Sequence, residues 1–409
     1  MSEKNQRSPL VIAFFTIFLD LLGFGIVIPV NSFYVQSLGA SPAVIAWLSA
    51  SYSLMQFLFA PFWGRLSDKI GRRPVILISV AASCAGHMIF GLSSTLFTVF
   101  AARLLAGFGN ANLGTAQAII SDVTTPENRA KGMGLIGAAF GLGFLLGPAI
   151  GGFAGQYSPQ APAIVAGVLA LINFLMAYFL LPETRVVGAD PSHQHRRTFS
   201  LDILRKAIKL PNVGTILKIG FLSTCAFSMF EVLVGLLMER AFLPIEGRST
   251  PEHIAQAAKL TAWFLVAVGI TAVVVQGGLI GRLTKKFGEK KLYQTGLVLM
   301  FVSIGFIPLM ADTGIYNSML IIAVILAAGT GIYNPSQSSL ISRSSPADQQ
   351  GGVLGLNHSI SALGRVAGPA LGGALFEIHT GAPFWTAGAI ILVAFLMSFK
   401  LNQPGVSQG

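Results

Sequence analysis

Long apolar runs separated by short polar segments occupy almost the whole chain of 409 residues. Each run is about 20 residues or longer, the length that a helix needs to cross about 30 Å of hydrocarbon. The pattern predicts an all-α membrane protein with twelve spanning helices, near residues 9–33, 43–64, 74–94, 96–121, 129–156, 160–182, 213–240, 258–281, 291–311, 315–342, 350–377 and 381–400.

The composition supports this prediction. Hydrophobic residues make up 53% of the chain and charged residues only 11%, whereas a soluble domain carries about 25% charged residues. The net charge of +11 does not call for a nucleic-acid partner, because the excess of basic residues in cytoplasmic loops of membrane proteins predicts it equally well. Both cysteines, Cys84 and Cys225, lie in apolar runs, which favours buried thiols over a disulfide. The first run is long and lacks a small-residue cleavage site, so we expect an uncleaved span.

The basic residues gather in alternate loops. They cluster in 64–74, 129–131, 196–209 and 282–291, whereas the intervening loops hold only Arg240, Arg248 and Lys259. Because basic loops stay on the cytoplasmic side, the N-terminus is expected there. An even number of spans then places both termini in the cytoplasm.

A single long polar segment, 182–212, interrupts the apolar pattern. It predicts an N-terminal bundle of six helices over 1–182, a basic cytoplasmic linker over 183–212 and a C-terminal bundle of six over 213–409. The two halves repeat: the triplet at 64–66 recurs at 281–283, and the motif at 147–152 recurs at 368–373. A duplicated bundle implies a pseudo-twofold axis along the membrane normal and a substrate cavity between the halves.

Four ionisable residues lie deep within the predicted spans: Asp20, Arg103, Glu231 and Arg365. Charges at this depth are costly and are usually functional. Asp20 lies about 16 Å from the cytoplasmic end of its span, and Arg103 has a similar depth. We therefore expect the two side chains to face one another or to share a water-filled cavity. The alternative is a static ion pair that only fixes the packing.

Glu231 lies among Phe227, Met229 and Phe230. Apolar surroundings favour the neutral form of a carboxyl group, so this side chain could load and release a proton. It could also bind a cationic substrate, and the two ligands would then compete for one site. The alternative is plain pairing with Arg365.

Several motifs resemble one transporter family. The pattern Gly-x-x-x-Asp-Lys-x-Gly-Arg-Arg at 64–73 resembles the loop 2–3 signature of the major facilitator superfamily. Residues 18–25 resemble the first-span motif of its bacterial drug:proton antiporters. Residues 103–109 resemble their fourth-span motif, with Ala106 in place of the usual glutamine. The segment 143–152 is similar to the fifth-span motif of the antiporter branch; its small residues at four-residue spacing allow close packing, and its proline bends the helix. Three further segments look most like tetracycline-efflux transporters: 50–57, 120–124 and 134–141.

The resemblance implies two six-helix bundles related by a pseudo-twofold axis. It also implies proton transfer through Asp20 and Arg103, and it makes the spans of Glu231 and Arg365 neighbours. Spans one, four, seven and ten line the substrate cavity in this superfamily, which implies substrate-binding roles for Phe24, Asn31, Asn110, Asn112, Gln117, Phe227, Phe230, Glu231, Asn334 and Gln337. The alternative for these residues is hydrogen bonding between helices and packing of the aromatic rings.

The loop at 64–74 is expected to act as a gate. The Asp68 carboxylate would lie near the N-terminus of span eleven, around 350–353, where the helix dipole favours an anion. Arg72 could reach Asp122, and the two contacts would hold the cytoplasmic side closed. In the second half Lys285 and Glu289 occupy the corresponding positions with inverted charge. The alternative is that these charges only set the topology. The gating residues predicted from this and from the fifth-span motif are Gly64, Asp68, Gly71, Arg72, Arg73, Asp122, Arg129, Gly143, Gly147, Pro148, Gly151 and Gly152.

The predicted function is a proton-coupled antiporter of the bacterial inner membrane that exports small amphipathic compounds or drugs by alternating access. Its expected partners are the small-molecule substrate, protons and the lipid bilayer; we expect a monomer with no cofactor, metal or nucleic acid. Two alternatives remain: a transporter of an endogenous metabolite such as a sugar or siderophore, and a transport-inactive scaffold or sensor. An enzyme is not expected, because no paired nucleophile and base or metal-ligand spacing occurs.

Overall fold

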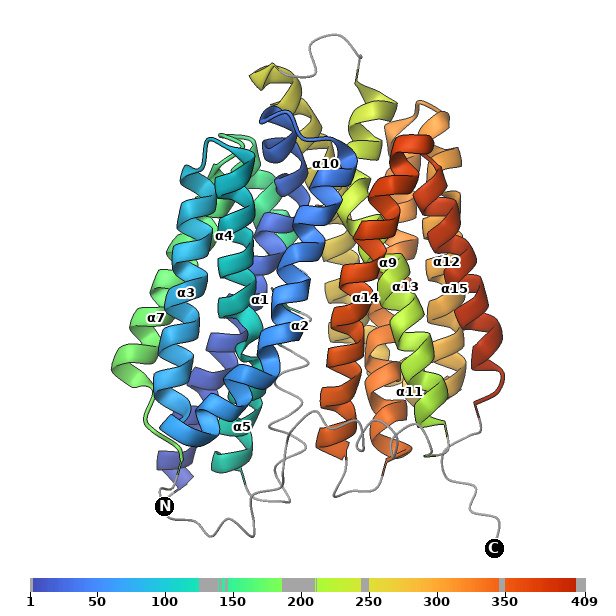
Figure 1. The fold of residues 1–409 in the computed structure, drawn as a ribbon. Coiled ribbons are helices and arrows are strands. Elements are labelled where there is room, and N and C mark those ends of the chain that lie inside the picture. The colour runs from blue at the N-terminus through green and yellow to red at the C-terminus, as the bar shows by residue number, and fades with distance from the viewer. Residues whose placement is uncertain are drawn as a thin grey trace, which may run out of the picture. The chain divides into compact units, whose positions relative to one another are not determined.

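The computed structural model describes residues 3–124, 139, 142–143, 146–185, 210, 212–243, 250–345 and 350–401. Every regular element in these ranges is helical (Figure 1). Among the described residues, nine helical stretches are long and apolar enough to cross a membrane. The predicted span near 129–156 lies largely outside the described residues. The all-α membrane fold is therefore confirmed, while the count of twelve spans stays a prediction.

The chain divides into two compact units, one of Met1–Leu38 with Ser51–Thr198 and one of Gly39–Ala50 with Phe199–Gly409. In the first unit a one-turn 3-10 helix interrupts the predicted fourth span. The two buried asparagines of this turn therefore lie outside the regular α-helical segments. The helices that contribute to this unit are α1 (Glu3–Ser37), α2 (Pro42–Ile70), α3 (Arg72–Leu92), α4 (Leu96–Gly109), η1 (Asn110–Asn112), α5 (Leu113–Val123), α7 (Ala161–Leu180) and the helical stretch 146–155.

Glycines at four-residue spacing pack the helix that contains 146–155 against α1. A Cβ atom on Gly147 would lie 2.8 Å from Gly25 Cα, and one on Gly143 would lie 2.7 Å from Leu21 Cβ. A Cβ atom on Gly151 would overlap the carbonyl oxygen of Ile26. Only hydrogen atoms fit between the two helices at these points, as the small-residue spacing of the sequence predicts. Gly152 is buried and Pro148 is half-buried in the same helix.

The second unit consists of a further set of apolar helices. A π-helical turn joins α10 to α11 into one continuous rod, at the pair Gly277–Gly278. The helices are α9 (Val213–Phe242), α10 (Pro251–Val273), η3 (Val274–Leu279), α11 (Ile280–Phe287), α12 (Glu289–Asp312), α13 (Tyr316–Arg343), α14 (Gln350–Ile378) and α15 (Ala382–Ser398).

The glycine packing of the first unit recurs in the second. Gly364, Gly368 and Gly372 of α14 lie 221 positions after the three glycines that pack on α1, and all three pack on α9. A Cβ atom on Gly364 would lie 3.0 Å from the Phe221 carbonyl oxygen, and one on Gly368 would overlap that of Cys225. The internal repeat therefore extends from the sequence to the way corresponding helices pack.

Candidate functional site

The carboxylate of Asp20 is held by two amide side chains inside the first unit. Asn112 Nδ2 donates to Asp20 Oδ2 at 3.0 Å, and Asn173 Nδ2 donates to Asp20 Oδ1 at 3.0 Å. Each amide is fixed by a second acceptor, Ser79 Oγ at 2.9 Å for Asn112 and the Thr16 carbonyl at 3.2 Å for Asn173. Helices α1, η1, α3 and α7 thus converge on one membrane-embedded acid.

The structure describes both Asp20 and Arg103 and shows no ion pair between them, and the expectation that the two side chains face one another stays a prediction. Arg103 is 1% exposed, and its guanidinium stacks over aromatic rings, with Cζ 4.3 Å from the centroid of Tyr52 and 5.9 Å from that of Phe90. The faces of aromatic rings attract a cation, most strongly where water is excluded. The acid and the base are therefore compensated separately, by amides and by rings. A water-filled cavity shared by the two stays a prediction.

Tyr52 connects three of the predicted residues. Phe24 stacks on the Tyr52 ring with centroids 4.9 Å apart, Arg103 lies over the same ring, and Asn110 Nδ2 donates to the Tyr52 hydroxyl at 2.7 Å. Arg103 Nε and Nη1 have no hydrogen-bond partner among the described residues. These two nitrogen atoms can therefore each donate a hydrogen bond to a further group, and they lie beside the Tyr52 ring.

Sequence reasoning missed two residues of this site, Tyr52 and Asn173. Asn173 is a single amide within an apolar run, and that isolation could have identified it, whereas Tyr52 stands between Ser51 and Ser53 and has no such signal. Asn112 was predicted to contact substrate, whereas here it contacts Asp20. Gln117 is half-buried on α5, and the side chain of Asn31 lies outside the described part of the chain.

In the second unit, Glu231 of α9 interacts electrostatically with Arg365 of α14. This interaction is compatible with the pairing that the sequence left open as an alternative, and a substrate or proton role for Glu231 stays a prediction. Phe230 is buried and its ring packs near those of Phe227, Phe264 and Phe384, with centroids 6.0, 6.2 and 6.3 Å away. Phe230 is therefore placed within the helix bundle core.

The remaining predicted substrate residues lie on α13. Gln337 is buried and its Nε2 donates to Asn357 Oδ1 of α14 at 3.4 Å. Asn334 is exposed three residues earlier on the same helix. Asn357, which the sequence reasoning missed, is an amide within the predicted eleventh span, next to His358 and Ser359.

The charged loop between α2 and α3 contains the contact expected between Arg72 and Asp122. Arg72 Nε donates to Asp122 Oδ2 at 3.1 Å, and Nη1 donates to Asp68 Oδ1 and, at 2.9 Å, to Ser67 Oγ. One guanidinium thereby ties together α2, α3 and α5. The side chain of Asp68 remains 53% exposed, and its predicted role at span eleven stays a prediction, as does gating by this contact. Arg129 lies outside the described residues.

Glu183, at the start of the predicted linker, contacts this loop and was missed. Its carboxylate accepts from the backbone amides of Arg72 at 2.9 Å and Arg73 at 3.2 Å. These are the first amides of α3, where a negative charge is favoured by the helix dipole. Gly71, directly before these two residues, has φ of 105°, and a Cβ atom there would overlap Glu183. At the other end of the signature, a Cβ atom added to Gly64 would meet nothing within 4 Å beyond its own helix backbone and chain neighbours.

Arg73 extends this arrangement to α7. Its Nη2 donates to the carbonyl oxygen of Tyr178 at 2.7 Å, and its Cζ lies 6.0 Å from the Tyr178 ring.

The second unit contains the corresponding contact with inverted charge. Arg343 Nη1 donates to Glu289 Oε1 at 2.8 Å and Oε2 at 2.7 Å, and Ser339 Oγ donates to Oε1 at 3.0 Å. Glu289 lies 217 positions after Arg72, and Arg343 lies 221 positions after Asp122. The acid and the base have thus exchanged places between the two halves. Lys285, expected to replace Asp68, is exposed.

The two helical units repeat the same glycine packing and contain equivalent charge pairs, and an acid lies within the spans. These features are typical of a secondary transporter built by duplication. The family model of the Major Facilitator Superfamily matches residues 13–275 and 249–408. The chain belongs to this superfamily, and it is a multi-pass membrane protein.

Relatives of known name cover nearly its full length. It is 29% identical to Multidrug resistance protein 2 of Bacillus subtilis over 96% of this chain and 94% of that protein. It is 30% identical to the class B Tetracycline resistance protein of Escherichia coli over 97% of each chain. It is 25% identical to Quinolone resistance protein NorA of Staphylococcus aureus over 96% of each.

Solved structures show the same fold. The human organic anion transporter MFSD10 matches with a TM-score of 0.70 at 22% identity, over 96% of this chain and 99% of that one. A bacterial homolog of the human lysosomal transporter Spinster, inward-facing and occupied, matches with a TM-score of 0.74 at 13% identity, over 98% of this chain and 97% of that one.

Proposed function

We propose that this protein is a proton-coupled antiporter that exports small amphipathic compounds, drugs among them, by alternating access. The observation that carries the proposal is the Asp20 carboxylate held inside the membrane by the neutral amides of Asn112 and Asn173. Relatives whose names denote resistance to drugs and tetracycline, matched over nearly the full length, support it.

The geometry around Asp20 suits a proton carrier. Both of its described hydrogen-bond partners are neutral, so taking up a proton leaves no partner cation unpaired. A buried cation that loses its counter-charge would cost several kcal/mol. The carboxyl group can therefore alternate between its charged and neutral forms at a smaller cost than the acid of a tight ion pair.

The proposed substrate contacts in the first unit are the ring of Phe24, the Tyr52–Asn110 pair and the guanidinium of Arg103. An aromatic wall with a few fixed polar groups suits amphipathic compounds. Glu231, with Arg365 beside it, supplies a second membrane-embedded acid that a cationic compound or a proton can neutralise.

The gating proposal rests on the two charge pairs, Arg72–Asp122 and Glu289–Arg343. Each joins the end of one span to the start of another at the basic, cytoplasmic side. Their release would accompany opening on that side. We further propose the bacterial inner membrane as the location, both termini in the cytoplasm, and a monomeric transporter that exchanges its substrate for protons.

The test is substrate-induced proton movement in proteoliposomes that contain the full chain and a trapped pH dye. A panel of cationic and neutral drugs, sugars and siderophores is added. We expect proton release with amphipathic drugs, and its loss in Asp20→Asn at an unchanged melting temperature within a few degrees. Asp312→Asn, at an exposed carboxyl group, is the matched control and should transport normally.

Proton release by Asp20→Asn equal to that of the unmodified protein would contradict the coupling role. A response confined to sugars or siderophores would assign the metabolite alternative. Absence of any response from a folded, correctly inserted protein would favour the scaffold.

A further inference from the structure

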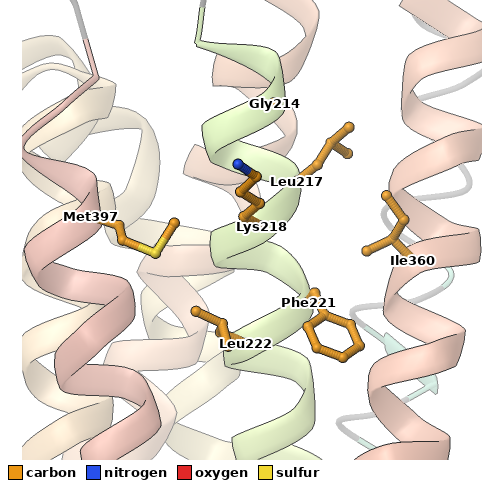
Figure 2. A pocket seen from close by; sticks show the side chains of 7 residues that line it. All are labelled: Gly214, Leu217, Lys218, Phe221, Leu222, Ile360 and Met397. Carbon is orange, nitrogen blue, oxygen red and sulfur yellow. The ribbon is translucent and has the colours of Figure 1, made fainter. Parts of the chain in front are cut away.

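A groove on the second unit lies along the first turns of α9, between α14 and α15 (Figure 2). It has a volume of about 330 Å³, at the lower end of the range for ligand pockets. Its lining residues are Gly214, Leu217, Lys218, Phe221, Leu222, Ile360 and Met397. All are apolar or glycine except one lysine, Lys218, whose ammonium points along α9 toward Gly214 (Figure 2).

Lys218 lies close to one end of a spanning helix. It comes five residues after the first residue of α9, about 8 Å along the axis, and it is exposed. A lysine at this depth extends its alkyl stem along apolar surface and places its ammonium at the headgroup level. The nearest acid on α9 is Glu231, thirteen residues further on and about 20 Å away along the axis. The ammonium therefore has no carboxylate nearby on its own helix.

A second cation lies at the same end of the unit. Lys400 is exposed just beyond α15, and its backbone amide donates to the carbonyl oxygen of Met397 at 3.1 Å. Met397 lines the groove, and Lys400 follows it in the chain by about one helical turn. Lys400 therefore lies just beyond the groove, on the side of the lipid headgroups. The acid on α14, Glu377, lies at the opposite end of that helix.

We propose that this groove binds one anionic phospholipid of the cytoplasmic leaflet. An acyl chain lies against Leu217, Phe221, Leu222, Ile360 and Met397, and the phosphate contacts Lys218, with Lys400 adding to the attraction. The outer surface of a spanning helix bundle is in contact with acyl chains, so an apolar groove there is filled by lipid. Basic pockets between spanning helices on the cytoplasmic side select anionic headgroups. Lys218 thus converts a general lipid contact into a selective site.

The experiment is native mass spectrometry of the full-length protein with equal amounts of phosphatidylglycerol and phosphatidylcholine. The unmodified protein should retain one phosphatidylglycerol in preference. Lys218→Gln should weaken that retention about five-fold, the value of one lysine near an anionic surface. Lys291→Gln removes an exposed lysine from the start of α12 at the same membrane side and is the matched control; it should change nothing. Leu222→Trp, which fills the groove, should lose the lipid while Lys218 remains.

Glycerol phosphate added alone should give no thermal stabilisation, because it lacks the acyl chains. Three results would each overturn the proposal: equal retention of the two lipids, undiminished retention by Lys218→Gln, and equal weakening by Lys291→Gln. Retention by a folded Leu222→Trp variant, or stabilisation by glycerol phosphate alone, would overturn the acyl-chain site. If Leu222→Trp fails to fold, Met397→Trp gives the same test from the opposite side of the groove.

Discussion

Asp20 and Arg103 illustrate two ways of keeping an ionisable side chain inside a membrane. The acid receives two amide hydrogen bonds, and the base lies over the faces of two aromatic rings. Both arrangements replace part of the lost hydration. Among the described residues neither arrangement uses an opposite charge, so protonation of Asp20 does not leave Arg103 without its partners. A proton can then move without breaking an ion pair.

The contribution of the Tyr52 ring can be separated from that of its hydroxyl. Tyr52→Phe keeps the ring under Arg103 but removes the acceptor for Asn110, whereas Tyr52→Leu removes both. We expect both variants to melt below the unmodified protein. The leucine variant should be the less stable by about 0.5–2 kcal/mol, the range of a desolvated cation–π contact. The measurement is thermal unfolding in detergent at fixed pH.

Equal melting temperatures for Tyr52→Phe and Tyr52→Leu would show that the ring face contributes nothing. Phe90→Leu serves as the control, because its ring lies further from the guanidinium, at 5.9 Å, and should matter less.

At the residue scale, the sequence identified the charges but not all of their partners. Asp20 and Arg103 stand out because any charge in an apolar run is costly. Neither Asn173 nor Tyr52 carries a charge, so Asn173 gives only a weaker signal in the sequence and Tyr52 gives none. They become informative only once α7 lies beside α1 and α2 beside α4, a proximity that local patterning does not encode.

At the scale of elements, the charged signature loop at 64–74 also contains the N-terminus of α3. Gly71 has a backbone conformation that only glycine adopts easily, and a side chain there would displace the Glu183 carboxylate from the first amides of α3. Gly64, seven residues earlier, is helical, and a Cβ atom there would meet open space. The two glycines of one motif therefore have different physical roles.

Alanine substitutions at these two glycines should separate those roles. Gly71→Ala should destabilise the protein by about 1–3 kcal/mol, the cost of a strained backbone position. Gly64→Ala should be neutral or slightly stabilising, because alanine is the better helix former. Apparent melting temperatures of the two variants, measured side by side, check this. Similar losses for both would contradict the assignment of Glu183 as the residue that caps α3.

The inverted pair of the second unit allows a charge-exchange test. Arg343→Glu places two carboxylates together at the ends of α12 and α13 and should lower the apparent melting temperature. The double variant Glu289→Arg with Arg343→Glu should restore most of the loss. Because Arg343 is 55% exposed, we expect a coupling of at most about 1 kcal/mol.

A thermal double-mutant cycle measures this coupling, and additive losses would show that the pair contributes nothing to stability. The equivalent cycle at Arg72 and Asp122 is the comparison. The Arg72 side chain is only 13% exposed, so its coupling should be the larger of the two.

At the scale of the whole molecule, the distribution of basic residues predicts the orientation in the membrane. We expect Tyr157, an exposed loop residue, to face outward and Gly64 to face the cytoplasm. In a variant with Cys84 and Cys225 replaced by alanine, a membrane-impermeant maleimide should label Tyr157→Cys in intact cells. Gly64→Cys should react only after permeabilisation. The reverse labelling pattern would show that the protein is inserted with its termini outside.

The sequence by itself determined the class of this protein, because the hydropathy of each apolar run depends only on the residues in that run. It also determined the duplication and the positions of the membrane-embedded charges. It predicted that small residues would pack helices closely, as Gly147 against Gly25 shows.

Only the tertiary structure decided which groups meet. The two amides that hold Asp20 come from 92 and 153 positions away along the chain, and the 3-10 turn at Asn110–Asn112 that presents one of them has no clear signal in an apolar span. Helical periodicity specifies which residues share a face, but many neighbouring helices could cover that face. The choice among them follows from the packing of all the helices of a unit at once, and that choice gave Asp20 neutral partners and Arg103 aromatic ones.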